Sequence, residues 1–345
     1  MKAVVIPRHG NAADVLELQD LPDLPAPAAG EAVIDILASP INPSDLLNVQ
    51  GRFRAKPAPV PAIGGAEGVG QIVAVGPGVD NVSVGDRVLV LFGGRGNWCE
   101  RVKVPAAELF ALDPQADVLQ LAMLAANPAT AWHMLHRFVK LQPGEWVLQN
   151  AGNSAVGQCV IRIARALGLR TISLVRRPEQ MAGLYEIGAD KVVVDCPQQT
   201  DVEANANHLA DQVAAAVDGA RIRLAFDAVA GDATGRLARC LTDGGTVVNY
   251  GLLADSQCHI AAPDVIFRRI ALHGFWFTGW FESSTAEERR EVYSQLVPML
   301  NNGTLKVAIE ATYPLERFSE AITHAAAESR KGKVLLVPNP HLLPN

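Results

Sequence analysis

The sequence predicts an α/β protein built from a doubly wound, mostly parallel sheet and a second, β-rich domain. From Trp146 to about Phe277, apolar runs of strand length alternate with segments of helical spacing, which is typical of a parallel sheet with helices on both faces. From Met1 to about Asp117, short apolar runs are separated by Gly and Pro, which indicates a compact β-rich domain. A chain of 345 residues is long enough for two such domains.

The composition narrows the class of protein. A net charge of −6 argues against a broad nucleic-acid surface, and no apolar run reaches the roughly 18 residues of a membrane span. The first residues already have the pattern of a strand, so we expect no signal peptide. The five cysteines are scattered without a C-x-x-C pair. We therefore expect a reducing, cytoplasmic setting with free thiols and no structural metal.

The β-rich domain begins with a strand at residues 1–7. Further strands are expected at 70–76 and 85–90, and the pattern becomes helical from Val118 to Leu135. Near the other end of the chain, a helix at about 286–301 and a closing strand at 332–337 are expected to return to this domain. The predicted boundaries are 1–128, completed by 278–345, for the β-rich domain and 129–277 for the parallel sheet.

The second domain contains the most informative segment. A strand at 146–150 is joined to a helix at about 156–168 by a turn of small residues, and a second strand follows at 171–175. Later strands are expected at 191–195, 224–229, 246–251 and 272–277. A strand, a glycine-containing turn and a helix in this order can hold a dinucleotide pyrophosphate, because the backbone approaches the phosphates and the N–H groups at the helix start attract negative charge.

The turn lacks the full G-x-G-x-x-G pattern, since Ala155 stands where many such loops carry glycine. The alternative is therefore a strand-to-helix turn that binds nothing. The residues expected to contact the cofactor here are Gly152, Asn153, Ser154, Ala155, Val156 and Gly157.

Arg176 and Arg177 follow the second strand of this domain, where NAD-preferring folds place an acidic residue. A basic residue at this position accommodates a 2′-phosphate, so the pair favours NADPH; the alternative is a solvated basic turn. Tyr250 and Gly251 lie at a later strand end and are expected to neighbour the cofactor, because ligands bind beyond the carboxyl ends of strands in such sheets.

Over essentially its whole length the chain resembles the medium-chain dehydrogenase/reductase superfamily. Within it, the chain is similar to the 2-enoyl thioester reductase branch, which includes the mitochondrial enzymes of fatty-acid synthesis, with quinone oxidoreductases next closest. The superfamily resemblance rests on 64–70, 84–88, the cofactor turn and 243–247, and the branch resemblance on 41–45, 127–132, 149–158 and 274–276. The resemblance implies a GroES-like catalytic domain and a Rossmann NADPH-binding domain.

The resemblance also bears on metal. Zinc-dependent alcohol dehydrogenases of the superfamily carry a cysteine near the position of Asn42 and a histidine immediately before the glutamate that is Glu67 here. This chain has Asn42 and Ala66 at those positions, and the four-cysteine structural lobe is reduced to Cys99. An amide and a methyl group cannot replace a thiolate and an imidazole. We therefore expect no metal, and reduction of an already polarised C=C bond or of a quinone.

The expected reaction is NADPH-dependent reduction of a trans-2-enoyl thioester carried on CoA or acyl-carrier protein. Members of the branch have a tyrosine, proposed as proton donor, at the position of Phe53, and a phenyl ring cannot donate a proton. This difference favours the alternative of an NADPH:quinone oxidoreductase. A second alternative is an NADPH-binding sensor with little catalysis, because fold alone does not define function.

Three further residues are candidates for the site. Asn42 either binds the substrate carbonyl or the nicotinamide ribose, or is a turn asparagine before Pro43. Thr130 either contacts the nicotinamide carboxamide, as the resemblance suggests, or is an ordinary helix-start residue. Trp276 either lines the cleft or belongs to the core or to the interface of a homodimer that pairs the edges of two sheets, as in relatives. We expect a small-molecule substrate, with no nucleic acid and no membrane.

Overall fold

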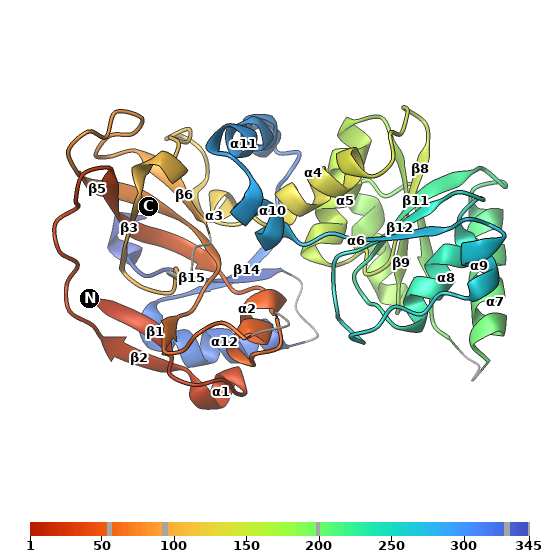
Figure 1. Ribbon diagram of the computed structural model, residues 1–345, viewed down its shortest axis with the longest axis horizontal. Helices are drawn as coiled ribbons and strands as arrows, with labels where there is room; N and C mark the ends of the chain where they lie inside the picture. Colours follow the sequence, from red (N-terminus) through yellow and green to blue (C-terminus); the bar gives the residue numbers. More distant parts are fainter. Residues whose placement is uncertain (54–56, 92–95, 198–200, 328–331, 344–345) are drawn as a thin grey trace. The chain divides into compact units, whose positions relative to one another are not determined.

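The computed structural model describes residues 1–53, 57–91, 96–197, 201–327 and 332–343. The chain folds as two units, one formed by Met1–Ala126 with Thr278–Asn345 and the other by Asn127–Phe277 (Figure 1). No helix in the described ranges is long and apolar enough to cross a membrane.

The first unit is β-rich, and the C-terminal part of the chain completes it. Its main sheet has the order β14-β15-β3-β5-β6, with β7 also paired to β3, and a small sheet has the order β2-β1-β4. The returning strand β15 pairs with β3 in antiparallel orientation, with Leu336 opposite Ser39. The strands are β1 (Lys2–Ile6), β2 (Glu17–Asp20), β3 (Glu31–Pro40), β4 (Ala62–Ile63), β5 (Glu67–Val75), β6 (Arg87–Leu91), β7 (Arg101–Pro105), β14 (Ile309–Tyr313) and β15 (Lys333–Leu336).

Short helices connect these strands. The α-helices are α1 (Ala12–Val15), α2 (Pro43–Val49), α3 (Val118–Leu121), α10 (Phe277–Ser283), α11 (Ala286–Asn301) and α12 (Phe318–Ala326), and the 3-10 helices are η1 (Ala106–Glu108), η3 (Leu315–Arg317) and η4 (Pro340–Leu342). The longest, α11, begins with a capping box in which Thr285 and Glu288 each bind the other's backbone N–H. Its bounds are the predicted ones.

The second unit contains a six-stranded parallel sheet of order β10-β9-β8-β11-β12-β13. The strand order reverses between β8 and β11, as in dinucleotide-binding folds. The strands are β8 (Trp146–Gln149), β9 (Arg170–Val175), β10 (Lys191–Val194), β11 (Ile222–Asp227), β12 (Thr246–Asn249) and β13 (Ala271–Gly274). The helices are α4 (Asn127–Arg137), α5 (Ala155–Ala166), η2 (Pro178–Gln180), α6 (Met181–Glu186), α7 (Val202–Ala216), α8 (Asp232–Cys240) and α9 (Ala262–Ile266). The predicted α/β class with its GroES-like and Rossmann parts is confirmed.

Two predicted elements are corrected. The helical pattern from Val118 to Leu135 is two helices, α3 and α4. The Asp117 carboxylate caps α3 by accepting the N–H groups of Leu119 and Gln120, and Pro128 lies in the first turn of α4, the only part of a helix that tolerates proline without distortion.

The strand expected at 272–277 ends at Gly274, before the aromatic residues. Its last ladder contact is made by the Phe275 N–H, which donates to the Asn249 carbonyl at 2.9 Å. Phe277 and Phe281 are both buried on α10 and are four residues apart, which is helical spacing. The composition of residues 272–277 is that of a strand, but packing of the face that carries Phe277 and Phe281 selected a helix.

Candidate functional site

The turn between β8 and α5 has the geometry of a phosphate cradle. Ala151 has a φ of 48°, an uncommon conformation for a residue with a side chain. A Cβ on Gly157 would lie 2.7 Å from the carbonyl oxygens of Ala151 and Gly152, so the helix packs directly on the turn. The Ser154 hydroxyl accepts the Gly157 N–H at 3.1 Å and caps α5.

These residues fit a dinucleotide. The first N–H groups of the twelve-residue helix α5 have no partners within the helix and attract anions. The six turn residues predicted to contact the cofactor, 152–157, lie together at the carboxyl end of β8. Close packing excludes larger residues at Gly157, so this last glycine of the pattern has a steric reason, although the middle glycine of the full motif is absent.

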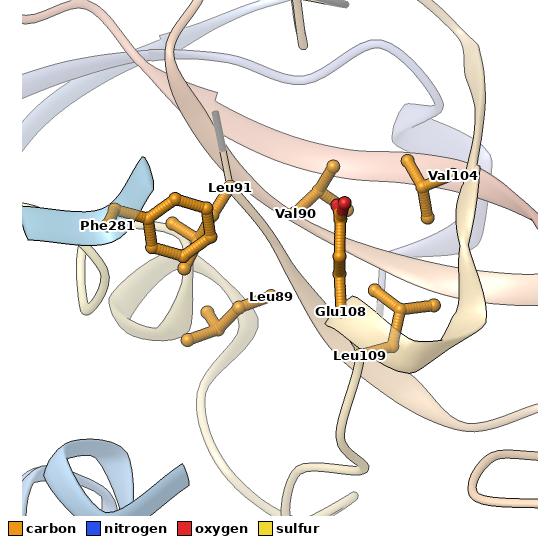
Figure 2. A pocket seen from close by; sticks show the side chains of 7 residues that line it. All are labelled: Leu89, Val90, Leu91, Val104, Glu108, Leu109 and Phe281. Carbon is orange, nitrogen blue, oxygen red and sulfur yellow. The ribbon is translucent and has the colours of Figure 1, made fainter. Parts of the chain in front are cut away.

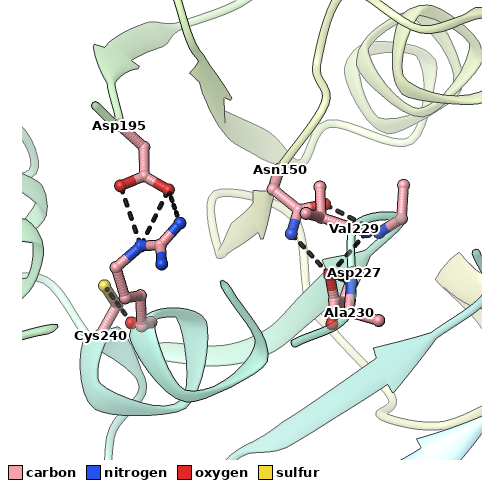
Figure 3. A network of polar contacts seen from close by, with 8 residues as sticks. Asn150, Asp195, Asp227, Val229, Ala230 and Cys240 are labelled. Atoms are coloured by element: carbon pink, nitrogen blue, oxygen red, sulfur yellow. Dashed lines mark hydrogen bonds and ion pairs between the residues drawn. The ribbon is translucent and has the colours of Figure 1, made fainter. Parts of the chain in front are cut away.

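A buried carboxylate joins three strand ends beside this turn. Asp227, the last residue of β11, accepts a hydrogen bond from the Asn150 amide at 2.6 Å (Figure 3). The Thr234 hydroxyl and the Asn249 amide donate to the same carboxylate at 2.6 and 3.2 Å. It also accepts the N–H groups of Val229 and Ala230 at 2.9 and 3.1 Å.

The Asn150 side chain completes this network, because its oxygen accepts the N–H of Ala228 at 2.8 Å. Asp227 is fully buried, and Ala230 has a φ of 66°. Hydrogen bonds to a buried carboxylate therefore hold the loop after β11 in a conformation that is costly for alanine. Asn150 and Asp227 shape the two loops at the switch point of the sheet, where such folds bind ligands.

Tyr250 follows β12 and reaches the cofactor turn. Its backbone N–H donates to the Asp227 carbonyl at 2.9 Å. Burial raises the pKa of its hydroxyl above the usual range, and the neighbouring Ser154 side chain opposes this effect. Gly251 is required next, because a Cβ there would lie 2.6 Å from the Ala228 carbonyl oxygen. The structure thus places both predicted residues at the same sheet edge as the turn.

Arg176 and Arg177 immediately follow β9, and both side chains are exposed. They lie at the carboxyl edge of the sheet that carries the cofactor turn, as the parallel arrangement of β8 and β9 requires. Thr130 is buried at 7% exposure in the first turns of α4. Trp276 lies between β13 and α10 and is 44% exposed. The contacts that these residues make with a cofactor or substrate stay predictions.

In the first unit, a buried polar cluster surrounds Asn42. The Asn42 amide donates to the Glu67 carboxylate at 2.8 Å, and its side-chain oxygen accepts a hydrogen bond from the Lys333 ammonium. The second Glu67 oxygen accepts the Ala126 N–H at 2.7 Å. Asn42, Glu67 and Lys333 are 5%, 0% and 5% exposed. The orientation of the Asn42 amide is therefore fixed by a cation on one side and a carboxylate on the other.

Asp45 lies in the same cluster and accepts the N–H groups of Asn42 at 2.8 Å and Ala66 at 3.0 Å. Burial raises the pKa of Asp45 to about 7, against the lowering effect of the Asn42 N–H. Burial also raises the pKa of Glu67, and the Lys333 ammonium and the Asn42 amide oppose this rise. Since Lys333 neutralises charge at this place, the cluster stabilises two buried carboxyl groups with one cation.

The two positions that bind zinc in the alcohol dehydrogenases of the resembled superfamily have a different chemistry here. Asn42 belongs to the cluster above, and the methyl group of Ala66 offers no ligand atom. Cys99 is fully buried, and burial raises the pKa of its thiol to about 12, so it is not a thiolate near neutral pH. Among the described residues, no group of three or more His, Cys, Asp or Glu side chains could hold a metal ion.

Phe53 lies in a bend after α2 and is half-buried. In the sequence, Arg52, Arg54 and Lys56 form a small basic cluster that either meets the phosphates of a CoA or acyl-carrier substrate or belongs to a solvated loop. Arg52 is exposed, and Arg54 and Lys56 lie outside the described residues.

A small hollow in the first unit is lined by apolar side chains and one carboxyl group (Figure 2). Its cavity volume is only about 10 Å³, far below the roughly 300 Å³ at which sites for drug-sized ligands begin. Its lining residues are Leu89, Val90, Leu91, Val104, Glu108, Leu109 and Phe281. We assign no ligand to it.

Sequence reasoning missed three groups of this architecture. Lys333 opens an otherwise apolar closing strand, and Asp227 ends one. A charged residue at the end of an apolar strand is the signal that could have drawn attention to both. The ion pair of Arg236 with Asp195 could not be found this way, because its members belong to unrelated elements.

A parallel sheet with a glycine-containing cradle at its switch point, joined to a GroES-like β-rich unit, defines a two-domain dinucleotide-dependent oxidoreductase. Two family models match the chain, one described as an alcohol dehydrogenase GroES-like domain over residues 28–114 and one as a zinc-binding dehydrogenase over residues 155–301. The mitochondrial enoyl-[acyl-carrier-protein] reductase of Xenopus tropicalis is 33% identical over 347 residues, covering 97% of this chain and 95% of the relative.

Solved structures of reductases are similar to this chain over nearly its full length. A putative NADPH:quinone reductase from Bacillus thuringiensis superposes with a TM-score of 0.87 at 28% identity, covering 97% of this chain and 98% of that one. Etr1p, a 2-enoyl thioester reductase of Candida tropicalis in complex with NADP and crotonyl-CoA, has a TM-score of 0.84 at 27% identity, covering 97% and 99%. The chain belongs to the medium-chain dehydrogenase/reductase superfamily, as its motifs predicted.

Proposed function

We propose that this protein is an NADPH-dependent reductase of trans-2-enoyl thioesters carried on CoA or acyl-carrier protein. The observation that carries the proposal is the cradle between β8 and α5, followed by Arg176 and Arg177, in a chain 33% identical to an enoyl-[acyl-carrier-protein] reductase over nearly its full length. The solved complex of Etr1p with NADP and crotonyl-CoA supports the same chemistry.

The chain supplies binding and orientation. Residues 152–157 would hold the pyrophosphate, and the guanidinium groups of Arg176 and Arg177 would bind the 2′-phosphate. Tyr250 would lie beside the coenzyme at the carboxyl edge of the sheet. NADPH, when bound, supplies the hydride that reduces the β-carbon of the enoyl thioester. The hydrogen-bond network of Asp227 keeps the cradle in shape when the coenzyme is absent.

We further propose that the reaction needs no metal. Asn42 and Ala66 replace the thiolate and imidazole of zinc-dependent members, and Lys333 already supplies a positive charge at Asn42. An enoyl thioester is polarised by its own carbonyl group, so a Lewis acid is not required for this substrate as it is for an alcohol. Full activity after dialysis against a chelator is the expected result, and loss of activity that zinc restores would contradict it.

The test of the main proposal is turnover. We expect the purified protein to oxidise NADPH with crotonyl-CoA or trans-2-hexenoyl-CoA and to act more slowly on a naphthoquinone. Preference for the quinone would establish the second candidate, an NADPH:quinone oxidoreductase, which Phe53 favours because a quinone takes protons from solvent once reduced. Tight NADPH binding without turnover of either substrate would indicate a sensor.

The variant Phe53→Tyr separates these substrates. If a side-chain proton donor is all that the thioester reaction lacks, the new hydroxyl raises the rate with crotonyl-CoA, by up to the 10²-fold scale of general acid catalysis, and leaves quinone reduction unchanged. No gain with the thioester would point to water as the proton donor or to a different substrate class. Phe110→Tyr, at an aromatic side chain of the same unit that stacks on Tyr293, serves as the control.

We also propose that the protein forms a homodimer through β13, one of the two edge strands of the parallel sheet. Large exposed apolar side chains gather on and near this edge: Val265, Ile266, Phe267, Leu272 and Trp276, with exposures of 48%, 64%, 76%, 42% and 44%. Exposed apolar patches beside the open edge of a sheet are typical of a protein–protein interface. Light scattering should give the mass of two chains and, for Leu272→Asp, of one; Val84→Asp, at an exposed site of the other unit, should leave the dimer intact.

We propose a cytoplasmic location because the five cysteines are scattered along the sequence without a C-x-x-C pair or a regular disulfide spacing, which suits a reducing compartment. Fractionation of cells that express the tagged chain tests this, and recovery in an oxidising compartment would contradict it.

A further inference from the structure

Strand β10 ends beside the strand that carries the two arginines. The strands are parallel, with Val194 opposite Val175, and the N–H of the next residue, Asp195, donates to the Val175 carbonyl at 2.8 Å. Neighbouring strands are about 4.8 Å apart. Asp195 and Arg176 therefore follow neighbouring strands and lie side by side in the backbone. Both are at the sheet edge where the adenosine end of the coenzyme is proposed to bind.

The Asp195 carboxylate is bound by an arginine from a different element (Figure 3). Arg236 on α8 donates its Nε to both carboxylate oxygens, at 3.0 and 3.1 Å, and its Nη2 to one of them at 2.8 Å. The two side chains are only 12% and 13% exposed. A bidentate ion pair that is mostly buried has a well-defined geometry, and dissolved salt screens it only weakly.

This pairing decides the charge beside the coenzyme site. An acidic residue near the adenosine ribose is what NAD-preferring folds use, and it repels a 2′-phosphate. An unpaired Asp195 would also attract the guanidinium groups of Arg176 and Arg177. In the part of the chain that the structure describes, neither of these arginines forms an ion pair with a carboxylate, so both remain available for an anion.

We propose that Arg236 determines coenzyme selectivity: by binding Asp195 it removes a negative charge that would otherwise oppose the 2′-phosphate of NADPH. The inference rests on the proposed function, in which Arg176 and Arg177 receive that phosphate. Arg236 itself is a positioning residue, since it acts through Asp195 and not by touching the coenzyme.

The experiment measures dissociation constants of NADPH and NADH by calorimetry. For Arg236→Gln we expect NADPH to bind about tenfold more weakly or worse, the scale for a unit charge within one or two strand spacings of a phosphate dianion, and NADH to change less than twofold. For Arg236→Lys, which keeps the charge, we expect the wild-type preference to remain within about threefold. For Asp195→Asn we expect no loss of preference.

The double variant Arg236→Gln with Asp195→Asn carries neither charge of the pair and should restore the NADPH preference. It therefore tests the proposal even if the single variant does not fold. Arg223→Gln is the matched control, because Arg223 makes a bidentate pair with Glu145 at 2.9 and 2.8 Å at the opposite, amino-terminal edge of the sheet; the coenzyme ratio should not change.

Equal weakening of both coenzymes by Arg236→Gln, or a double variant that does not recover, would overturn the inference. Loss of preference in Arg236→Lys as large as in Arg236→Gln would overturn it as well, because shape and not charge would then be responsible. A wild-type protein without preference for NADPH would instead overturn the proposed function on which the inference rests.

Discussion

Removing the Lys333 ammonium tests the charge balance of the buried cluster in the first unit. In Lys333→Met the Glu67 carboxylate, which has no exposed surface, keeps its hydrogen bonds from Asn42 and Ala126 but loses its cation. Breaking a buried pair by removing one partner costs about 3–5 kcal/mol, because the remaining charge is uncompensated. We expect this loss in the free energy of unfolding near pH 8.

The double variant Lys333→Met with Glu67→Gln has neither charge, and the new amide can still accept and donate hydrogen bonds. We therefore expect it to recover most of the lost stability, which gives a coupling energy of several kcal/mol in a double-mutant cycle. Lowering the pH should also restore part of the stability of Lys333→Met, because the pKa of Glu67 is already raised by burial and loss of the cation raises it further, so protonation removes the unpaired charge.

The assay is unfolding by a chemical denaturant, monitored by tryptophan fluorescence. Trp98, which is fully buried in the first unit, reports on the unfolding of that unit. Lys103→Met is the control: Lys103 pairs with Glu31 at 3.1 Å, but the side chains are 23% and 34% exposed, and such a pair contributes at most about 1 kcal/mol. Additive effects of the two changes in the cycle, or a loss in Lys333→Met no larger than that of the control, would show that Lys333 does not compensate the charge of Glu67.

Three other predictions concern the network residues and the cradle. The carboxyl group of Asp45 has a pKa of about 7 in the folded protein, so it keeps its proton at pH values where the same group in the unfolded chain has lost it. We therefore expect the free energy of unfolding to fall by about 4 kcal/mol as the pH rises from about 4 to 7. In Asp45→Asn, unfolding measured at both ends of this range should show a smaller dependence on pH. Asp227→Asn replaces an acceptor of five hydrogen bonds and should weaken NADPH and NADH alike in calorimetry, whereas a selective effect would contradict its role as a scaffold. Gly157→Ala should displace the turn, because its Cβ would meet backbone oxygens at 2.7 Å, and should weaken NADPH at least tenfold in the same measurement; unchanged affinity would show that the pyrophosphate binds elsewhere.

The alternation of strands and helices and the cofactor turn could be predicted from the sequence because their determinants are local. A strand, a turn of small residues and an amphipathic helix are contiguous, and Ser154 caps the helix that it precedes. The steric need for glycine at position 157 arises within the same ten residues. Where local signals conflicted, prediction failed: the aromatic run at 275–277 has the composition of a strand, but the chain leaves the sheet at Gly274 and begins α10 at Phe277.

Local sequence patterns were therefore enough to predict the fold class, the place of the dinucleotide cradle, the basic strand end at Arg176 and Arg177 and the membership of the superfamily. The pairing of polar and charged groups that lie far apart in the sequence, in contrast, became known from the folded structure alone. The partners Lys333 and Asn42 are 291 residues apart, Asn150 and Asp227 are 77 apart, and Arg236 and Asp195 are 41 apart. Each pair depends on strand register and helix packing across the unit, and no local pattern of residues carries that information.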